Sequence, residues 1–162
     1  MKSLIVYSLP VSQKDFIVAH SDSRAHRPEN KLEHAVDFPL PEGTPILAAA
    51  DGVVTVVYMD SSEGGQEEKF KKNINLYTNR ICIKHSENES SWYAHLLHKS
   101  QKVKVGDIVK RGEVIALSGH TGFSSKPHLH FDVRTDEINA IGEKTWKTVD
   151  INWEVNFEIK RK

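Results

Sequence analysis

Two stretches of the chain repeat the same order of turns and strands, and this repetition most constrains the fold. The first covers residues 41–54 (PEGTPILAAADGVV) and the second covers residues 103–116 (VKVGDIVKRGEVIA). In each stretch glycines stand at the tight turns, where glycine reaches positive φ without strain, and pairs of apolar residues follow. Each stretch therefore predicts a turn, a strand, a second turn and a second strand.

The rest of the chain also favours strands. Few windows place apolar residues at helical spacing, whereas short β-rich runs alternate with Gly, Pro, Asn or Ser. Such a number of short strands predicts an all-β barrel or sandwich. The polar segment 61–73, rich in Glu and Lys, is expected to be a solvated excursion between strands. The expected strands are residues 4–7, 46–49, 52–59, 79–85, 91–95, 102–105, 114–118, 128–134 and 152–159.

The length and the charge of the chain limit its class. We expect its 162 residues to form a single domain, residues 1–162, with its own core. The 22 basic and 22 acidic side chains cancel, so no overall field attracts nucleic acid or an anionic membrane. No apolar run is long enough to span a membrane, and the N-terminus lacks the features of a signal peptide. As written, the protein is expected to be cytoplasmic, with export by another route left open; its oligomeric state is not determined.

A pair of histidines carries the clearest chemical signal. His128 and His130 stand two residues apart in the run HLHFDV, residues 128–133, which predicts a strand. Residues two apart on a strand point to the same side, so both imidazoles face one way. Two imidazoles fill an apolar core poorly, because each carries ring nitrogens that need a partner. We therefore expect the pair to face a groove or a metal ion.

Two further clusters contain histidine or carboxylate side chains, EHAVDF at residues 33–38 and WYAHL at residues 92–96. Zinc takes histidine nitrogens and carboxylate oxygens as ligands, and a catalytic zinc site keeps one position open for water. One histidine of the pair, a further histidine and Asp37 would complete such a site. His95 and the other paired histidine would then lie beside the metal, where they handle protons or support an oxyanion.

Together, and in this order, these motifs resemble the lysostaphin-type (LytM-like) zinc endopeptidases, which cut peptide bonds in bacterial cell walls. The resemblance runs from about residue 33 to residue 133. It implies a barrel-sandwich fold, the duplicated hybrid motif, with an open groove that holds the metal site. The motifs that carry it include VDF at 36–38, PEGTP at 41–45, YAHL at 93–96, VGD at 105–107 and PHLH at 127–130.

The same resemblance implies roles for particular residues. Asp37 and His130 would be metal ligands, His95 and His128 would assist catalysis, and Tyr93 would line the site and bind substrate. The cofactor would be Zn²⁺, and the substrate would be a peptide of peptidoglycan type or a glycine-rich peptide.

The first metal ligand departs from the family pattern. The family usually reads His-x-x-x-Asp, but here Glu33 stands four residues before Asp37, and His34 stands three before it. An offset of three does not share a face on a regular strand, so His34 joins Asp37 only across a bulge or turn. Three candidates are open: His34 by ligand chemistry, Glu33 by register, and His26 from the preceding loop. We expect His34, since imidazole is a strong zinc ligand.

The sequence therefore predicts a zinc metalloendopeptidase, a hydrolase that acts on peptide bonds. The first alternative is a catalytically silent member of the same fold that acts as a binding or scaffold module, as the shifted first ligand and the missing export signal indicate. The second is a histidine carrier of the phosphotransferase type with the same hybrid motif, in which Asp37 has no role. Bound equimolar zinc with a water ligand would favour the enzyme, and a site without metal would favour the module.

Overall fold

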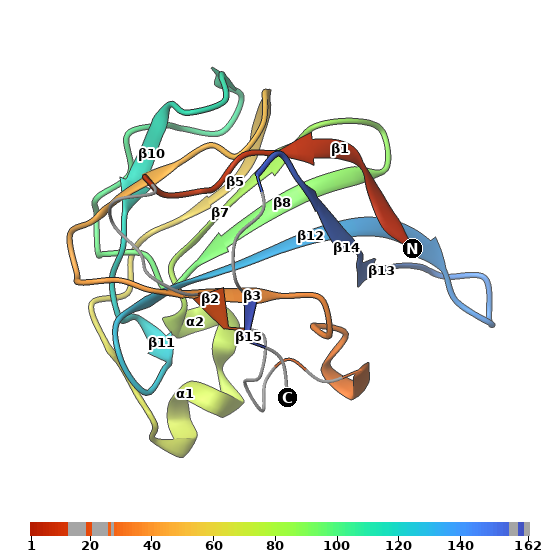
Figure 1. Ribbon diagram of the computed structural model, residues 1–162. Coiled ribbons are helices and arrows are strands. Elements are labelled where there is room, and N and C mark those ends of the chain that lie inside the picture. The colour runs from red at the N-terminus through yellow and green to blue at the C-terminus, as the bar shows by residue number, and fades with distance from the viewer. Residues whose placement is uncertain (13–18, 21–25, 27, 156–158, 161–162) are drawn as a thin grey trace.

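The computed structural model describes residues 1–12, 19–20, 26, 28–155 and 159–160, and strands dominate it (Figure 1). Two short helices, α1 (Glu68–Lys72) and α2 (Ile74–Tyr77), and one turn of 3₁₀ helix, Pro28–Asn30, complete the regular structure. The strands are β1 (Lys2–Tyr7), β2 (Ala19–His20), β3 (Val36–Pro39), β4 (Pro45–Leu47), β5 (Gly52–Tyr58), β6 (Gly64–Gly65), β7 (Arg80–Lys84), β8 (Glu89–Ala94), β9 (Ile108–Val109), β10 (Val114–Leu117), β11 (Gly122–Phe123), β12 (His128–Ile138), β13 (Lys144–Thr148), β14 (Asp150–Trp153) and β15 (Ile159–Lys160).

One sheet of nine strands organises the molecule, in the order β15-β2-β3-β12-β8-β7-β5-β9, with β13 also paired to β12. The longest strand, β12, has 11 residues and pairs with β3, β8 and β13 along its length. In Figure 1 it crosses the molecule beside β8. The predicted all-β class is confirmed, and the arrangement is compatible with the expected barrel-sandwich.

The two repeated stretches pair with each other. Strand β4 of the first stretch is antiparallel to β10 of the second, and β5 of the first is antiparallel to β9 of the second. The turns of the second stretch also hydrogen-bond to the first. The Gly112 N–H donates to the Ala48 carbonyl at 2.8 Å, and the Gly106 N–H donates to the Val54 carbonyl at 2.8 Å. Gly106 and Gly112 have φ values of 94° and 84°, in the region that glycine reaches without strain.

Residues 102–105 form no strand, and that prediction is wrong. The Asp107 side chain accepts the Lys104 backbone N–H at 2.9 Å, and the Asp107 N–H donates to the Lys104 carbonyl at 3.1 Å. Aspartate commonly closes a turn on its own neighbouring backbone in this way, which competes with strand pairing. For the expected strand at 152–159, β14 covers the first two residues and β15 the last, residues 154–155 form a bend, and residues 156–158 lie outside the described part.

The segment 61–73 is more ordered than an excursion of solvated chain. It contains β6 and α1, and β6 pairs in parallel with β11. The side chain of Phe70 in α1 is 2% exposed, and its ring lies edge-on to the ring of Tyr77 at a centroid distance of 5.0 Å. A single buried aromatic ring thus anchors a polar helix. Within the described residues, no helix is long and apolar enough to cross a membrane.

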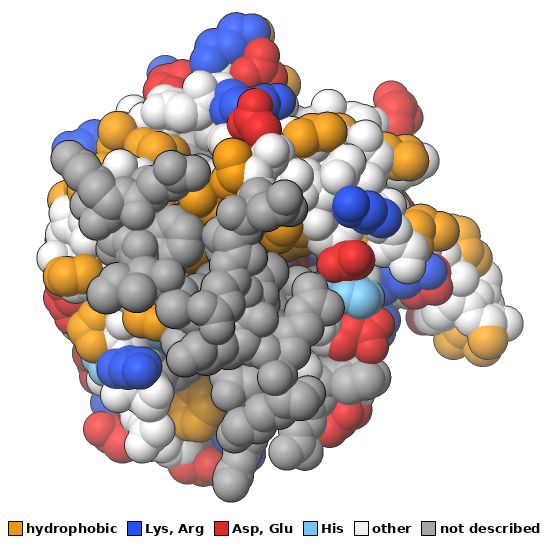
Figure 2. All heavy atoms as spheres, viewed as in Figure 1, with side chains coloured by type: hydrophobic (Ala, Val, Ile, Leu, Met, Phe, Trp, Pro, Cys, Tyr) orange, Lys and Arg blue, Asp and Glu red, His pale blue; other side chains and the backbone are white. Residues whose placement is uncertain are grey.

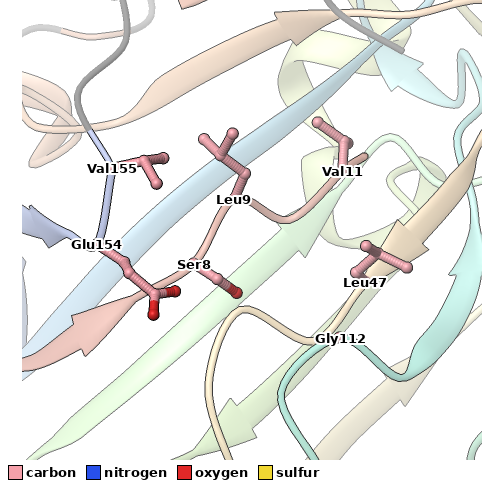
Figure 3. Close-up of a pocket in the computed structure, with 7 residues that line it drawn as sticks. All are labelled: Ser8, Leu9, Val11, Leu47, Gly112, Glu154 and Val155. Carbon is pink, nitrogen blue, oxygen red and sulfur yellow. The ribbon is translucent and has the colours of Figure 1, made fainter. Parts of the chain in front are cut away.

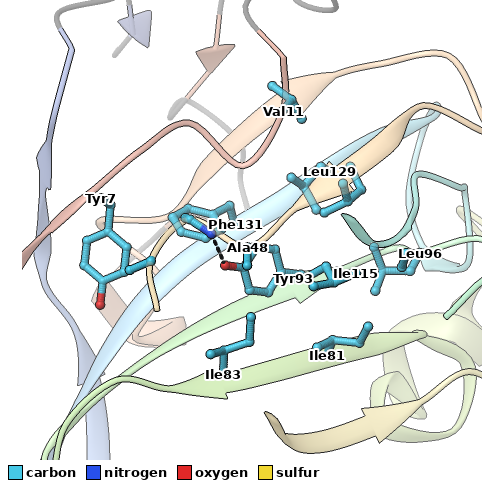
Figure 4. Close-up of a cluster of buried hydrophobic side chains, with 14 of the residues drawn as sticks. Tyr7, Val11, Ala48, Ile81, Ile83, Tyr93, Leu96, Ile115, Leu129 and Phe131 are labelled. Atoms are coloured by element: carbon cyan, nitrogen blue, oxygen red, sulfur yellow. Dashed lines mark hydrogen bonds between the residues drawn. The ribbon is translucent and has the colours of Figure 1, made fainter. Parts of the chain in front are cut away.

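The hydrophobic core covers one face of the central sheet. On β12 the alternate residues Leu129, Phe131 and Val133 are fully buried in it. Figure 4 shows Phe131 and Leu129 among core side chains that come from β7, β8 and β10. Because side chains alternate along a strand, the intervening residues of β12 face the other side of the sheet. That opposite face carries the histidine pair.

The surface is mixed in charge. In the coloured parts of Figure 2, Lys and Arg side chains lie among Asp and Glu side chains, and the formal net charge is zero. A pocket of about 230 Å³ opens beside the start of the chain (Figure 3). It contains no residue of the histidine clusters and is therefore separate from the candidate site. Its lining residues are Ser8, Leu9, Val11, Leu47, Gly112, Glu154 and Val155.

Candidate metal centre

The polar face of β12 presents His128 and His130 on the same side, as their spacing predicted. In the sheet His130 pairs directly with Asp37 of the neighbouring strand β3. On β3 the flanking residues Val36 and Phe38 are buried in the core, so Asp37 faces the side of the histidines. The alternation within two paired strands thus brings a carboxylate and two imidazoles together.

Three potential ligand atoms converge on one point. Asp37 Oδ1 lies 3.0 Å from His130 Nδ1 and 3.2 Å from His26 Nε2. The two ring nitrogens, His26 Nε2 and His130 Nδ1, are 3.2 Å apart. The side chain of His26 is fully buried, and that of Asp37 is 17% exposed. Among the described residues these three side chains form the one group of three or more His, Cys, Asp or Glu ligands in reach of each other.

This arrangement fits a small divalent cation. Zinc–nitrogen and zinc–oxygen bonds are about 2.0–2.1 Å long, so ligand atoms of a tetrahedral site lie about 3.3 Å apart. The three measured separations of 3.0, 3.2 and 3.2 Å are close to that value. Hydrogen bonds alone satisfy the group poorly: if both rings donate to Asp37, their two N–H groups face each other. A cation at the centre would satisfy all three atoms at once.

His34 is not part of this group, and His26 takes the place that we predicted for it. His34 and Glu33 lie in the turn before β3, and His34 Nε2 is 3.5 Å from Glu33 Oε1. The backbone N–H of His34 donates to Thr148 Oγ1 at 3.3 Å. Strand register favoured Glu33 and ligand preference favoured His34, both just before β3, whereas the structure brings His26 to Asp37 and His130.

His95 and His128 lie beside the three-atom group with a common hydrogen-bond arrangement. His95 Nδ1 is 2.6 Å from the Thr121 carbonyl, and His128 Nδ1 is 2.8 Å from the Lys126 carbonyl. A carbonyl only accepts, so Nδ1 carries the proton in both rings and Nε2 keeps its lone pair. The ring centroids are 4.5 Å apart, and His128 Nε2 lies 3.7 Å from Asp37 Oδ1.

His95 adopts a backbone conformation that is uncommon for a residue with a side chain. Its φ is 62°, directly after the end of β8 at Ala94. The neighbouring Leu96 is fixed by its carbonyl, which accepts hydrogen bonds from Thr121 Oγ1 at 3.0 Å and Asn79 Nδ2 at 3.1 Å. Surrounding structure therefore holds the turn that directs the His95 ring to the site, as is common where function requires strain.

Burial and neighbouring charge shift the pKa values of four of the five site residues in different directions. Burial, with the nearby His128 and His130, lowers the pKa of His95 to about 3, and burial also lowers the pKa of His128. Burial opposes the charge of His130, but Asp132 and Asp37 raise its pKa to about 9. Burial likewise opposes the charge of Asp37, yet hydrogen bonds from His130 and His26 hold its pKa well below the usual value. Both shifts favour the neutral form of the His95 and His128 rings.

Tyr93 does not line the site, and that prediction is corrected. Its side chain is fully buried in the hydrophobic core, as Figure 4 shows. The phenol oxygen accepts hydrogen bonds from the Ala49 N–H at 2.9 Å and from Ser91 Oγ at 3.0 Å. Tyr93 precedes His95 by two residues, but the turn at His95 separates their directions. The tyrosine therefore supports the sheet from within the core.

Comparison with known proteins identifies the family. Residues 31–141 match the model of Peptidase family M23, which is more than half of the chain. The chain belongs to this family. The resemblance to the lysostaphin-type endopeptidases, inferred from the motifs, is thereby confirmed.

Named relatives agree with this assignment. The chain is 33% identical over 137 residues to the peptidoglycan DD-endopeptidase ShyA of Vibrio cholerae, which covers 82% of the chain and 28% of ShyA. It is 34% identical over 100 residues to lysostaphin of Staphylococcus staphylolyticus, which covers 62% of the chain and 18% of lysostaphin. The crystal structure of a zinc-containing peptidase from Vibrio cholerae superimposes with a TM-score of 0.58 at 29% identity, over 80% of the chain and 36% of that structure. The chain spans less than a third of the length of these two curated relatives.

Proposed function

We propose that this protein is a zinc-dependent endopeptidase that hydrolyses peptide bonds in substrates of peptidoglycan type. The observation that carries the proposal is the convergence of His26 Nε2, Asp37 Oδ1 and His130 Nδ1, with the rings of His95 and His128 beside them. Membership of Peptidase family M23 supports it. So do the names of two similar proteins, a peptidoglycan DD-endopeptidase and a zinc-containing peptidase.

The metal ligands in this proposal are His26, Asp37 and His130, so that His26 replaces His34. Two imidazole nitrogens and one carboxylate oxygen favour zinc over magnesium or calcium, which prefer sets of oxygen ligands. Three protein ligands leave a fourth position open, as in catalytic zinc sites. When bound, zinc supplies Lewis-acid chemistry: it polarises the scissile carbonyl and makes water more acidic.

The remaining chemistry belongs to His95 and His128. Peptide hydrolysis requires that the attacking water lose a proton and that the leaving amine gain one. In both rings Nδ1–H is held by a backbone carbonyl, of Thr121 or Lys126, so Nε2 is the atom that accepts and returns the proton. A ring protonated at Nε2 also donates a hydrogen bond to the oxyanion of the tetrahedral intermediate. The carbonyls keep each ring in the required orientation during both steps.

The test combines metal content with product analysis. Protein purified without added metal should contain about one zinc per chain by mass spectrometry of the metals. The zinc-loaded protein should release new amino groups from purified peptidoglycan or from glycine-rich peptides. Removal of zinc with a chelator should stop cleavage, and equimolar zinc should restore it. If the zinc-loaded protein cleaves no member of this panel, a silent binding module becomes the better description.

A further inference from the structure

The polar face of β12 continues beyond the metal centre with two residues that the proposed function does not use. Asp132 follows His130 by two residues, and Arg134 follows Asp132 by two, so all three lie on one face. The Asp132 side chain is completely buried. Burial of a carboxylate is unfavourable unless the group is paired and hydrogen-bonded. The groups that pair with Asp132 therefore stabilise its charge in the interior.

Asp132 joins the metal centre to Arg134. Its Oδ1 accepts Arg134 Nε at 2.6 Å, and its Oδ2 accepts Arg134 Nη2 at 3.1 Å. The same Oδ2 lies 3.3 Å from His130 Nε2. A two-pronged contact with a planar guanidinium fixes the plane of a carboxylate as well as its position. The oxygen that faces His130 is thus held in a defined place.

Arg134 is itself held between two aromatic rings. The centre of its guanidinium lies 3.9 Å from the ring centroid of Trp146 and 4.3 Å from that of Trp92. Trp146 belongs to β13 and Trp92 to β8, the strands on either side of this part of β12. The faces of aromatic rings attract cations, and two of them restrict how the flat group can turn. Three adjacent strands therefore contribute to the clamp.

We propose that Asp132 is the positioning residue for the metal ligand His130, and that Arg134 with its two tryptophans holds Asp132 in place. The inference rests on the proposed metal centre. A ligating histidine gives up one of its two ring protons; Asp132 Oδ2, 3.3 Å from His130 Nε2, holds the remaining proton on that nitrogen and so leaves the lone pair to Nδ1, the atom that faces Asp37 and His26. A carboxylate behind a ligating histidine fixes its tautomer and its ring orientation in many metal sites. Loss of this partner lets the ring turn or carry its proton on Nδ1, and both weaken binding of a metal ion.

The direct test is the affinity of the purified protein for zinc alone, measured by competition with a chromogenic chelator. Asp132→Asn keeps the shape of the side chain but exposes an N–H₂ group either to Arg134 or to His130. We expect its zinc affinity to fall about 10- to 100-fold. The matched control is Asp136→Asn, on the same strand, where the carboxylate pairs with Lys144 at 2.8 Å and is 41% exposed. Its zinc affinity should equal that of the parent.

A second measurement separates positioning from a general effect on stability. Nitrogen-15 spectra of the zinc-loaded proteins should show His130 protonated at Nε2 and ligating through Nδ1 in the parent and in Asp136→Asn. In Asp132→Asn the His130 signals should broaden or report a different nitrogen as ligand. A structural role alone would lower the melting temperature of the metal-free protein and leave this pattern unchanged.

Arg134→Lys tests the clamp while it preserves the positive charge. An ammonium group cannot make the two-pronged contact or stack between two rings, so zinc affinity should fall severalfold even if Asp132→Asn does not fold. Unchanged zinc affinity in a folded Asp132→Asn, or in Arg134→Lys, would overturn the inference. A parent protein that binds no zinc would instead refute the proposed function, so the two failures are distinguishable.

Discussion

His130 on β12 and Asp37 on β3 lie directly opposite each other in the sheet, with 3.0 Å between Nδ1 and Oδ1. The pairing of two strands that are far apart in the sequence therefore brings together two of the three ligands of the proposed metal centre. The third candidate ligand atom, His26 Nε2, belongs to a residue outside the strands, so no strand register specifies its position. Two candidate ligands are thus placed by strand pairing and the third is not, and the first prediction tests the third.

His26→Ala should lose zinc, because removal of one of three protein ligands leaves too few donors for a tetrahedral site. His130→Ala should lose zinc for the same reason. His34→Ala and Glu33→Gln, the two residues that sequence spacing favoured, should retain about one zinc per chain. Metal analysis after dialysis measures all four variants. Zinc retained in His26→Ala but lost in His34→Ala would restore the original assignment.

His95→Ala and His128→Ala should keep their zinc but lower peptide-bond cleavage by about a hundredfold or more, the scale typical of acid–base and oxyanion groups. Their Nε2 atoms do not belong to the three-atom group, although His128 stands only two residues from the ligand His130. The assay is release of amino groups at matched zinc content. An empty metal site in His128→Ala would contradict the division between ligand and catalyst on β12.

Leu129→Ala should reduce the free energy of unfolding by about 2–5 kcal/mol, because it leaves a cavity in a packed core. Leu129 is fully buried between His128 and His130, on the core side of the same strand. Urea unfolding of the metal-free protein measures the change. The control is Ile138→Ala, because Ile138 is the last residue of β12 and is 66% exposed. Equal effects of the two substitutions would show that the assigned core face is incorrect.

The protein should lose stability above about pH 10, the pKa of a free phenol. Burial, with the charge of Glu89, raises the pKa of Tyr7 above the usual value, and burial raises that of Tyr93 to about 12. The folded state then holds more protons than the unfolded state, so the stability present below pH 10 declines as the pH rises toward 12. Melting temperatures of metal-free protein between pH 8 and 11 measure the slope.

Tyr7→Phe supplies the comparison for the alkaline experiment. It removes the phenol that donates to Glu89 Oε1 at 3.0 Å, so its melting temperature at neutral pH should be lower. Its decline above pH 10 should be shallower than that of the parent, because one of the two buried phenols no longer titrates. A decline as steep as in the parent would exclude Tyr7 as a source of the effect.

Local sequence patterns determined the part of the site that lies on strands, namely Asp37 of β3 and the histidine pair of β12. Side chains alternate along a strand, so the spacing of His128 and His130 placed them on one face and left Leu129 and Phe131 for the core. Glycines at the turns of the two repeated stretches predicted where strands reverse, because few other residues accept positive φ. These features depend on neighbours in the sequence, and for that reason the all-β class could be predicted from it.

Only the tertiary structure decided which residues complete and support the metal centre. His26 lies 3.2 Å from Asp37 although it belongs to no strand, so no periodic pattern predicts the contact. Tyr93 and His95 are two residues apart, yet the positive φ at His95 ends the alternation and sends one ring to the core and the other to the site. The pairing of Asp132 with Arg134 could be suspected from their spacing. Its place between Trp92 and Trp146, however, depends on the register of three strands, which is fixed only when the sheet forms.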